Sequence, residues 1–288
     1  MIKIDDIGIN VRYSLNDKSV VLFLHFSGGN LNMLEGILPQ FENKYSIIVP
    51  DFRGHGKSDK PLAGYHIDDM ANDIYLLLEK LNVERCHIVG SSMGAEVGLS
   101  LAASHPELVL SLICEGALYN EFGEYGLFNG TRDEIQHRKQ VMRAELAERE
   151  ERVFKTKEEY IEEKRAELAQ QGLWNEYFLA FFEHNLQQMQ NGNFTYCYLN
   201  HIRTEYVQKY WDVKFEQYYK KVKCPILFLP SEEEWKDEKI RSILSAFTSL
   251  LDTYEIEHIE NSIHAYVWMQ LPLTAGEVVK GFISKHDK

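Results

Sequence analysis

The sequence is poor in positive charge and has no long apolar run. Its 288 residues include 31 Lys and Arg against 44 Asp and Glu, which gives a formal net charge of −13. Such a charge repels nucleic acid and anionic membrane surfaces, and no apolar stretch approaches the length of a membrane span. The first residues show no basic segment followed by an apolar one, as a secretion signal would. We therefore expect a cytoplasmic protein with no nucleic-acid or membrane partner.

Cysteine is scarce, and its spacing gives no sign of a metal site. The chain has four cysteines, Cys86, Cys114, Cys197 and Cys224. They form no CxxC pair, and three fall in or beside apolar runs, where a thiol behaves as a small hydrophobe. HExxH, clustered Cys and His, and Walker-type glycine loops are all missing from the sequence. We expect reduced cysteines, no metal and no cofactor.

Continuously apolar runs alternate with helical patterns along most of the chain. Four runs are typical of strands covered on both faces, at residues 20–24, 47–49, 109–113 and 226–229. Helical patterns lie between the first three of these, at residues 31–38, 70–81 and 95–103, and residues 1–16 alternate as a two-stranded edge hairpin does. This order predicts an α/β fold with a mostly parallel central sheet flanked by helices.

One tight turn organises this prediction. The stretch Gly90-Ser91-Ser92-Met93-Gly94 follows an apolar strand and precedes a helix. A sharp turn of this kind forces its central residue towards positive φ and brings strand and helix so close that only glycine fits at both flanks. The Ser92 hydroxyl would then stand above the sheet, with the first helical amides beside it.

Two further loops follow predicted strands, where the reacting groups of parallel sheets gather. They are His25-Phe26-Ser27-Gly28-Gly29 and the loop 51–58. The order of an HxxGG loop, a DxRGxGxS loop and a GxSxG turn, followed late by an acid and a histidine, resembles the α/β-hydrolase fold superfamily, specifically its cap-bearing serine hydrolases. The resemblance covers residues 18–118 and 222–284. It implies a core in two parts, 1–120 and 224–288, with a helical cap inserted at 121–223.

The resemblance also implies a nucleophile, a base and an acid. A serine hydroxyl needs a base in hydrogen-bond reach and a third group to orient that base. Ser92 is the expected nucleophile and His264, after the last strand, the expected base. Counting along the loop after the cap gives Glu234 as the acid. Other acids remain as alternatives. Glu232, Glu233 and Asp237 lie close to Glu234 in sequence, and Glu115 lies at the end of the strand that contains the apolar run 109–113.

The oxyanion hole is expected from the amides of Met93 and Ser27. Here the sequence departs from the family, because the usual HG dipeptide is His25-Phe26. A Cβ therefore occupies a place that the family keeps bare, and Phe26 is the alternative donor.

The insertion begins with dense alternating charge over residues 132–170, typical of one or two solvated helices. An aromatic stripe follows at helical spacing, comprising Trp174, Tyr177, Phe178, Phe181 and Phe182 and continued by Leu186 and Met189. The stripe could fix the insertion to the core or roof an apolar pocket over Ser92. We expect packing as its main role and name Phe26, Trp174, Phe178 and Phe182 as candidates for lining a substrate pocket.

The sequence thus predicts a serine hydrolase that cleaves a carboxylic ester of a small, partly apolar substrate through an acyl-enzyme on Ser92. Activity should fall around pH 6 to 7 as His264 becomes protonated. Two alternatives stay open: hydrolysis of a carbon–carbon bond, thioester or lactone by the same residues, and a binding module that kept the turn without catalysis. The sequence does not define the oligomeric state.

Overall fold

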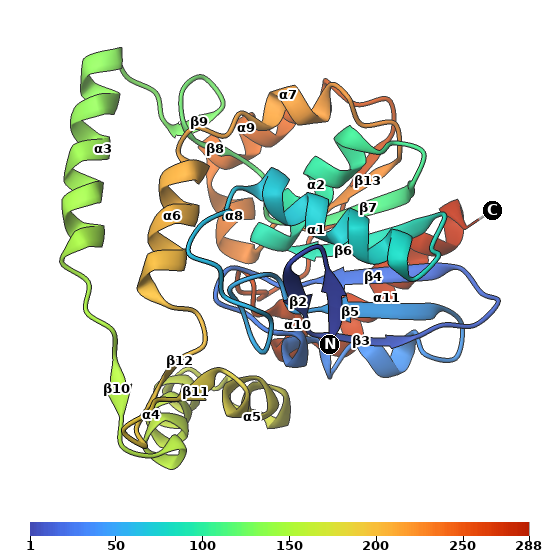
Figure 1. Ribbon diagram of the computed structural model, residues 1–288. Coiled ribbons are helices and arrows are strands. Elements are labelled where there is room, and N and C mark those ends of the chain that lie inside the picture. Colours follow the sequence, from blue (N-terminus) through green and yellow to red (C-terminus); the bar gives the residue numbers. More distant parts are fainter. Residues whose placement is uncertain (288) are drawn as a thin grey trace.

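The computed structural model describes residues 1–287, and a seven-stranded sheet lies at its centre (Figure 1). The strand order is β14 (Tyr254–Ile256), β13 (Ile226–Phe228), β7 (Val109–Glu115), β6 (Cys86–Ser91), β4 (Val20–Leu24), β5 (Ser46–Pro50) and β3 (Val11–Ser14). Every pairing is parallel except that of β3 with β5. The mostly parallel sheet predicted from the apolar runs is confirmed.

The amino-terminal segment forms three strands where the sequence predicted two. β1 (Ile2–Ile4) and β2 (Ile7–Ile9) pair as an antiparallel hairpin outside the main sheet. β3 continues from this hairpin and joins the sheet edge along β5. The alternating pattern of residues 1–16 fits both arrangements, because hairpin strands and edge strands each keep one wet face.

Helices cover both faces of the sheet, and two buried clusters fill the space between. Leu22 and Leu24 of β4 belong to the cluster that includes α1 (Ile67–Lys80), α2 (Met93–Ser104) and α9 (Glu238–Thr248). Val21 and Phe23 belong to the other, with α10 (Val267–Gln270) and α11 (Pro272–His286). Alternate side chains point to opposite faces of a strand, so burial on both faces explains why these runs are apolar throughout.

The predicted helix at residues 31–38 is instead two short 3-10 turns, η1 (Leu31–Leu34) and η2 (Leu38–Gln40). Pro39 has no amide hydrogen to continue an α-helical ladder. Asp51 also accepts a hydrogen bond from the Leu31 amide at 2.7 Å, which ties the first turn to the end of β5. Tertiary contacts and proline together override the local helical pattern.

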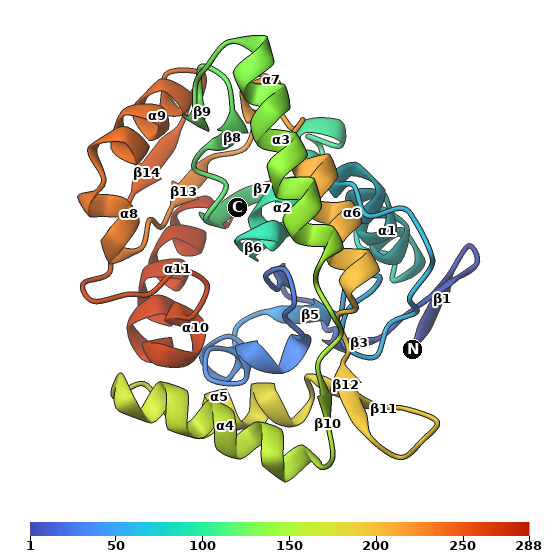
Figure 2. The same ribbon diagram turned by 90° about the vertical axis from the view of Figure 1, so that its left-hand side faces the viewer.

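Residues 121–223 hold helices in two groups. α3 (Arg132–Ala147) lies beside α6 (Asn200–Tyr210), whereas α4 (Lys157–Gln170) and α5 (Glu176–Glu183) form a second pair at another end of the molecule (Figures 1 and 2). β10 (Val153–Phe154) precedes α4 in sequence, and β11 (Leu186–Gln188) and β12 (Phe194–Tyr196) follow α5. These three strands form a small antiparallel sheet in the order β10-β12-β11. The remaining elements are β8 (Asn120–Phe122), β9 (Gly126–Phe128), α7 (Phe215–Tyr219) and α8 (Glu232–Lys236).

The charged part of the insertion, expected as one or two helices, forms α3 and α4. The aromatic stripe forms α5 except for Trp174, which precedes the helix. α5 ends at Glu183, so Leu186 lies in a strand and does not extend the helix. All four cysteines are buried and unbonded to one another. Within residues 1–287, no helix combines the length and apolar character needed to cross a bilayer.

Candidate active site

The turn at Ser92 has the geometry that its glycines predict. Ser92 stands between β6 and α2 with φ of 51° and ψ of −118°, a strained backbone for a residue with a side chain. A Cβ at Gly90 would lie 2.5 Å from the Ala95 nitrogen, and one at Gly94 would overlap the Leu24 carbonyl oxygen. Glycine is therefore required on both sides for the turn to close.

His264 lies opposite the serine. Its Nε2 is 3.2 Å from the Ser92 Oγ, which is within the reach of a general base. His264 follows β14 in the loop before α10 and keeps 39% of its side chain exposed. The structure thus brings together the serine and histidine that the sequence places 172 residues apart.

The carboxylate nearest to the far side of His264 belongs to Glu115. Its Oε1 is 2.9 Å from the His264 Nδ1, whereas the Oε1 of Glu234 is 3.7 Å away. Glu115 also accepts hydrogen bonds from the Ser91 hydroxyl at 2.6 Å and the Ala265 amide at 2.8 Å. The expectation that Glu234 orients the histidine gives way to Glu115, which the sequence retained only as an alternative.

The position of Glu234 has a local cause. Ser231 caps α8, and the Glu234 carboxylate bonds back to the Ser231 amide at 2.9 Å, completing a capping box. Glu115, in contrast, ends the strand that pairs with β6, and its partner in the register is Ser91, which precedes Ser92. The other candidates lie elsewhere: Glu232 pairs with Lys236 and His258, Glu233 is exposed, and Asp237 caps α9.

The carboxylates strongly favour the charged form of the histidine. Burial alone would lower the pKa of His264, but Glu115, and then Glu234 and Glu96, raise this pKa to about 9. Burial alone would likewise raise the pKa of Glu115, yet His264 and the hydrogen bonds from Ser91 and Ala265 lower it overall. The titration of His264 is thereby expected near pH 9 and not around 6 to 7.

The two expected oxyanion donors come from the start of α2 and from the loop after β4. Met93 is the first residue of α2, and the first amides of a helix have no acceptor within the helix. Ser27 lines the same cavity as Ser92 and His264, whereas Phe26 does not. The hydroxyl groups of Ser27 and Tyr198 are 2.8 Å apart.

The loop that carries Ser27 is held by His25. The Phe52 amide donates to the His25 Nε2 at 3.0 Å, so the proton sits on Nδ1, which donates to the Phe26 carbonyl at 2.8 Å. The Gly29 amide donates to the same carbonyl. These bonds explain how the loop keeps its shape although Phe26 replaces the family's glycine.

A cavity of about 290 Å³ opens onto the Ser92 hydroxyl. Its cover comes from Met142 of α3, from Tyr206 and Tyr210 of α6, and from Trp211 just after α6. Glu96, Glu121 and Glu234 complete part of its wall. Ser92 and His264 thus line one cavity whose cover comes from α3 and α6.

The candidates Trp174, Phe178 and Phe182 do not line this cavity. α5 lies against η1 and α10, where Phe178 packs edge-on to Tyr266 with ring centroids 5.3 Å apart. Phe26 joins the same cluster through Phe181. The aromatic stripe thus packs against the core, which was its expected main role, and the four candidate residues do not line the cavity at Ser92.

Sequence reasoning missed Glu96 and the role of α6. Glu96 is only 5% exposed and accepts a hydrogen bond from the Tyr206 hydroxyl at 2.8 Å. Burial raises the pKa of Glu96 to about 7, against the lowering effect of that bond. A signal was present, since Glu96 follows Ser92 by one helical turn and Tyr206 and Tyr210 share one face of α6.

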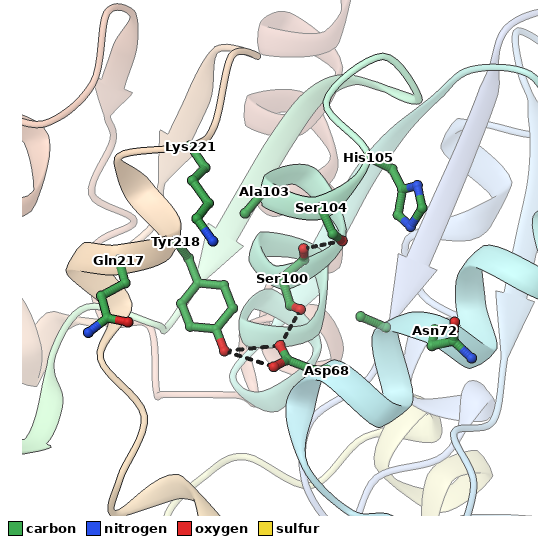
Figure 3. Close-up of a pocket in the computed structure, with 10 residues that line it drawn as sticks. Asp68, Asn72, Ser100, Ala103, Ser104, His105, Gln217, Tyr218 and Lys221 are labelled. Carbon is green, nitrogen blue, oxygen red and sulfur yellow. Dashed lines mark hydrogen bonds between the residues drawn. The ribbon is translucent and has the colours of Figure 1, made fainter.

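A second cavity, of about 460 Å³, lies between α1, α2 and α7, away from Ser92 (Figure 3). Asp68 stands at its floor and accepts hydrogen bonds from Ser100 at 2.6 Å and Tyr218 at 3.0 Å. A hydrogen bond with His66, and then the bonds from Ser100 and Tyr218, lower the pKa of Asp68 to about 2. The central carboxylate of this cavity is thus already engaged with protein donors.

Among residues 1–287, no group of three or more His, Cys, Asp and Glu side chains is placed to hold a metal ion. The side chains that line the Ser92 cavity include hydroxyl, imidazole and carboxyl groups.

Comparisons with known proteins agree with this fold. A family model described as alpha/beta hydrolase fold matches residues 19–223. The chain is similar to 3-oxoadipate enol-lactonase 2 of Acinetobacter baylyi, with 34% identity over 103 residues, 35% of this chain and 39% of that protein. It is also similar to 2-(acetamidomethylene)succinate hydrolase of Mesorhizobium japonicum, with 35% identity over 112 residues, 39% of this chain and 40% of that protein. The matches thus span less than half of these relatives' length.

Solved structures resemble the whole chain. A crystal structure of E-2-(acetamidomethylene)succinate hydrolase aligns with a TM-score of 0.75 and 20% identity, covering 97% of this chain and 96% of the other. A thioesterase domain from the curacin biosynthetic pathway aligns with a TM-score of 0.76 and 15% identity, covering 97% of each chain. At such identities the likeness shows the fold.

Proposed function

Because the chain belongs to the alpha/beta hydrolase fold family, we propose that it is a serine hydrolase in which Ser92, His264 and Glu115 act together. The observation that carries the proposal is the continuous hydrogen-bonding line from the Ser92 hydroxyl through both ring nitrogens of His264 to Glu115. A binding module has no need of that line, nor of the strained backbone that exposes the serine.

The proposed mechanism follows from the positions of these groups. Ser92 attacks a carbonyl carbon while the His264 Nε2 takes its proton, and Glu115 stabilises the imidazolium that forms. The Met93 amide, and that of Ser27 on the facing loop, are proposed to stabilise the oxyanion. His264 then gives the proton to the leaving group. A water molecule, deprotonated by the same histidine, attacks the acyl carbon, and His264 returns this proton to the Ser92 Oγ as the acid leaves.

The size of the cavity supports a small substrate. A space of about 290 Å³ lies at the lower end of the range for small-molecule sites. We propose a carboxylic ester or a closely related acyl bond. Lactone hydrolysis is the second candidate, because a relative at 34% identity is named as an enol-lactonase.

The test compares the wild type with Ser92→Ala on p-nitrophenyl esters from acetyl to long acyl chains. The proposal predicts that the variant loses several orders of magnitude in kcat/KM, and that short chains are preferred by the wild type. A panel of small lactones, assayed in parallel, separates the two candidate bonds. Equal rates in both proteins on every substrate would refute the assignment of Ser92.

A further inference from the structure

Carboxyl groups dominate the charge of the Ser92 cavity. Glu96, Glu121 and Glu234 line it, and Glu115 lies behind His264. The described residues that line it include neither lysine nor arginine. The acids outnumber His264, the one basic side chain in the lining, so the net charge of the cavity favours a cationic occupant and opposes an anionic one.

Glu96 offers a free acceptor there. It is 95% buried, and its Oε2 accepts the Tyr206 hydroxyl at 2.8 Å. Across residues 1–287, no donor is recorded for its other oxygen, Oε1. Because Glu96 lines the cavity, a ligand there can donate a hydrogen bond to this oxygen.

The phenol of Tyr119 lies within reach of the same four acids. Burial raises the pKa of its phenol to about 12, and four carboxylates reinforce the shift, namely Glu234, Glu121, Glu96 and Glu115. Tyr119 itself lines the cavity. The four acids therefore act on one shared space and are not scattered over separate surfaces.

From this arrangement, we propose that the substrate carries a positively charged amine close to its scissile carbonyl, with Glu96 as the principal acceptor of that amine. The proposal rests on the proposed function, since it names the substrate class of the same site. An ammonium group donates three hydrogen bonds, enough to engage the open oxygen of Glu96 and a second acid of the wall.

The position of Glu96 limits the distance between amine and carbonyl. The Glu96 amide donates a hydrogen bond to the Ser92 carbonyl at 3.1 Å, and the two residues line the same cavity of about 290 Å³. A carbonyl held at Ser92 and an ammonium held at Glu96 are then separated by only a few bonds, as in α-amino or β-amino esters.

The test uses three ethyl esters with the same two-carbon spacer and different charge: β-alanine ethyl ester, its N-acetyl derivative and monoethyl succinate. L-alanine ethyl ester and its N-acetyl derivative extend the test to the α-amino case. We expect kcat/KM for at least one amino ester to exceed that of its N-acetyl derivative by about tenfold or more, with monoethyl succinate the poorest substrate.

Substitutions of the acids test which residue causes the preference for the amine. Glu96→Gln keeps the size of the side chain and should reduce the ratio of amino to N-acetyl ester by about tenfold. Glu121→Gln provides a second variant with a smaller expected reduction. Glu84→Gln removes an exposed carboxylate from the loop before β6. This loop lies at the amino end of β6, whereas Ser92 follows its carboxyl end, so the ratio of amino to N-acetyl ester should stay unchanged.

Calorimetry on Ser92→Ala with the same esters reads binding without turnover, so it separates this inference from the proposed function. Tighter binding of an amino ester, weakened by adding Glu96→Gln, supports the inference even if hydrolysis is slow. Hydrolysis of the N-acetyl esters without any preference for the amine, matched by equal binding, would overturn it while leaving the serine hydrolase intact. A preference for monoethyl succinate would also overturn it, and would point to Arg149 and Arg203 in the adjoining cavity of about 450 Å³.

Discussion

Replacing Glu115 by glutamine tests which acid serves His264. The Glu115 carboxylate accepts three hydrogen bonds, from the Ser91 hydroxyl, the Ala265 amide and the His264 Nδ1. The glutamine oxygen can keep the bonds to Ala265 and His264, while its amide group turns to Ser91. The substitution therefore removes the negative charge and little else.

The expected loss of kcat/KM follows from the distance between the Glu115 carboxylate and the His264 ring. At 2.9 Å between Oε1 and Nδ1, and with an effective dielectric constant of about 20, the charge attracts an imidazolium by about 6 kcal/mol. At about 1.4 kcal/mol per decade, that corresponds to roughly a 10⁴-fold fall in kcat/KM, the scale expected when the acid of such a triad becomes an amide.

The assay is kcat/KM for p-nitrophenyl acetate as a function of pH. In the wild type His264 has a pKa raised to about 9, and the base works only when neutral, so kcat/KM should fall as pH drops below about 9. In Glu115→Gln the fall in kcat/KM should occur at lower pH, because the carboxylate charge that raises the pKa of His264 is gone.

Glu234→Gln is the matched control. Its carboxylate lies 3.7 Å from Nδ1 and bonds to the Ser231 amide, so it contributes charge without orienting the ring, and its loss should cost only about tenfold. If Glu234→Gln loses as much activity as Glu115→Gln, or more, the assignment of Glu115 is refuted.

Two further substitutions test the framework of the site. Gly94→Ala places a Cβ against the Leu24 carbonyl and should lower the free energy of unfolding by several kcal/mol in urea titrations. The control Gly281→Ala has open space around the new Cβ and should not lower the free energy of unfolding. Equal stability of the two variants would contradict the packing argument. Tyr206→Phe removes the recorded donor to buried Glu96 and should destabilise the protein by about 1–3 kcal/mol in the same assay; an unchanged unfolding midpoint would show that this bond contributes nothing to stability.

The sheet and the nucleophile turn were predictable from the sequence because their signals are local. Strands buried on both faces must be apolar throughout, and a turn that leaves no room for a Cβ must carry glycine. The order of nucleophile and late histidine also narrowed eleven histidines to His264. These predictions needed no knowledge of which strands lie next to each other.

The acid was harder to predict because its choice depends on strand order. Glu234 follows the strand after the cap, as the family pattern suggests, but it is held by its own helix cap. Glu115 reaches His264 because β7 lies directly beside β6, a relation that no local pattern expresses. The ion-pair distances, and not the residue count along the loop, separate the two glutamates.

The cover of the cavity was mispredicted for a similar reason. The α5 stripe has the stronger aromatic signal, yet a stripe at helical spacing shows only that one helix face is buried, and α5 buries it against η1 and α10. The weaker pair Tyr206 and Tyr210 faces Ser92. Which buried face meets the nucleophile depends on how the insertion folds over the core.

The central claim is that Ser92 is an activated nucleophile. The most direct measurement is labelling with a fluorophosphonate, followed by mass spectrometry of the digested protein. The account predicts one adduct, on the peptide that contains Ser92, that forms in the wild type, is absent in Ser92→Ala and forms far more slowly in His264→Ala. Absence of an adduct in the wild type, or an adduct on another residue with ester hydrolysis retained in Ser92→Ala, would contradict it.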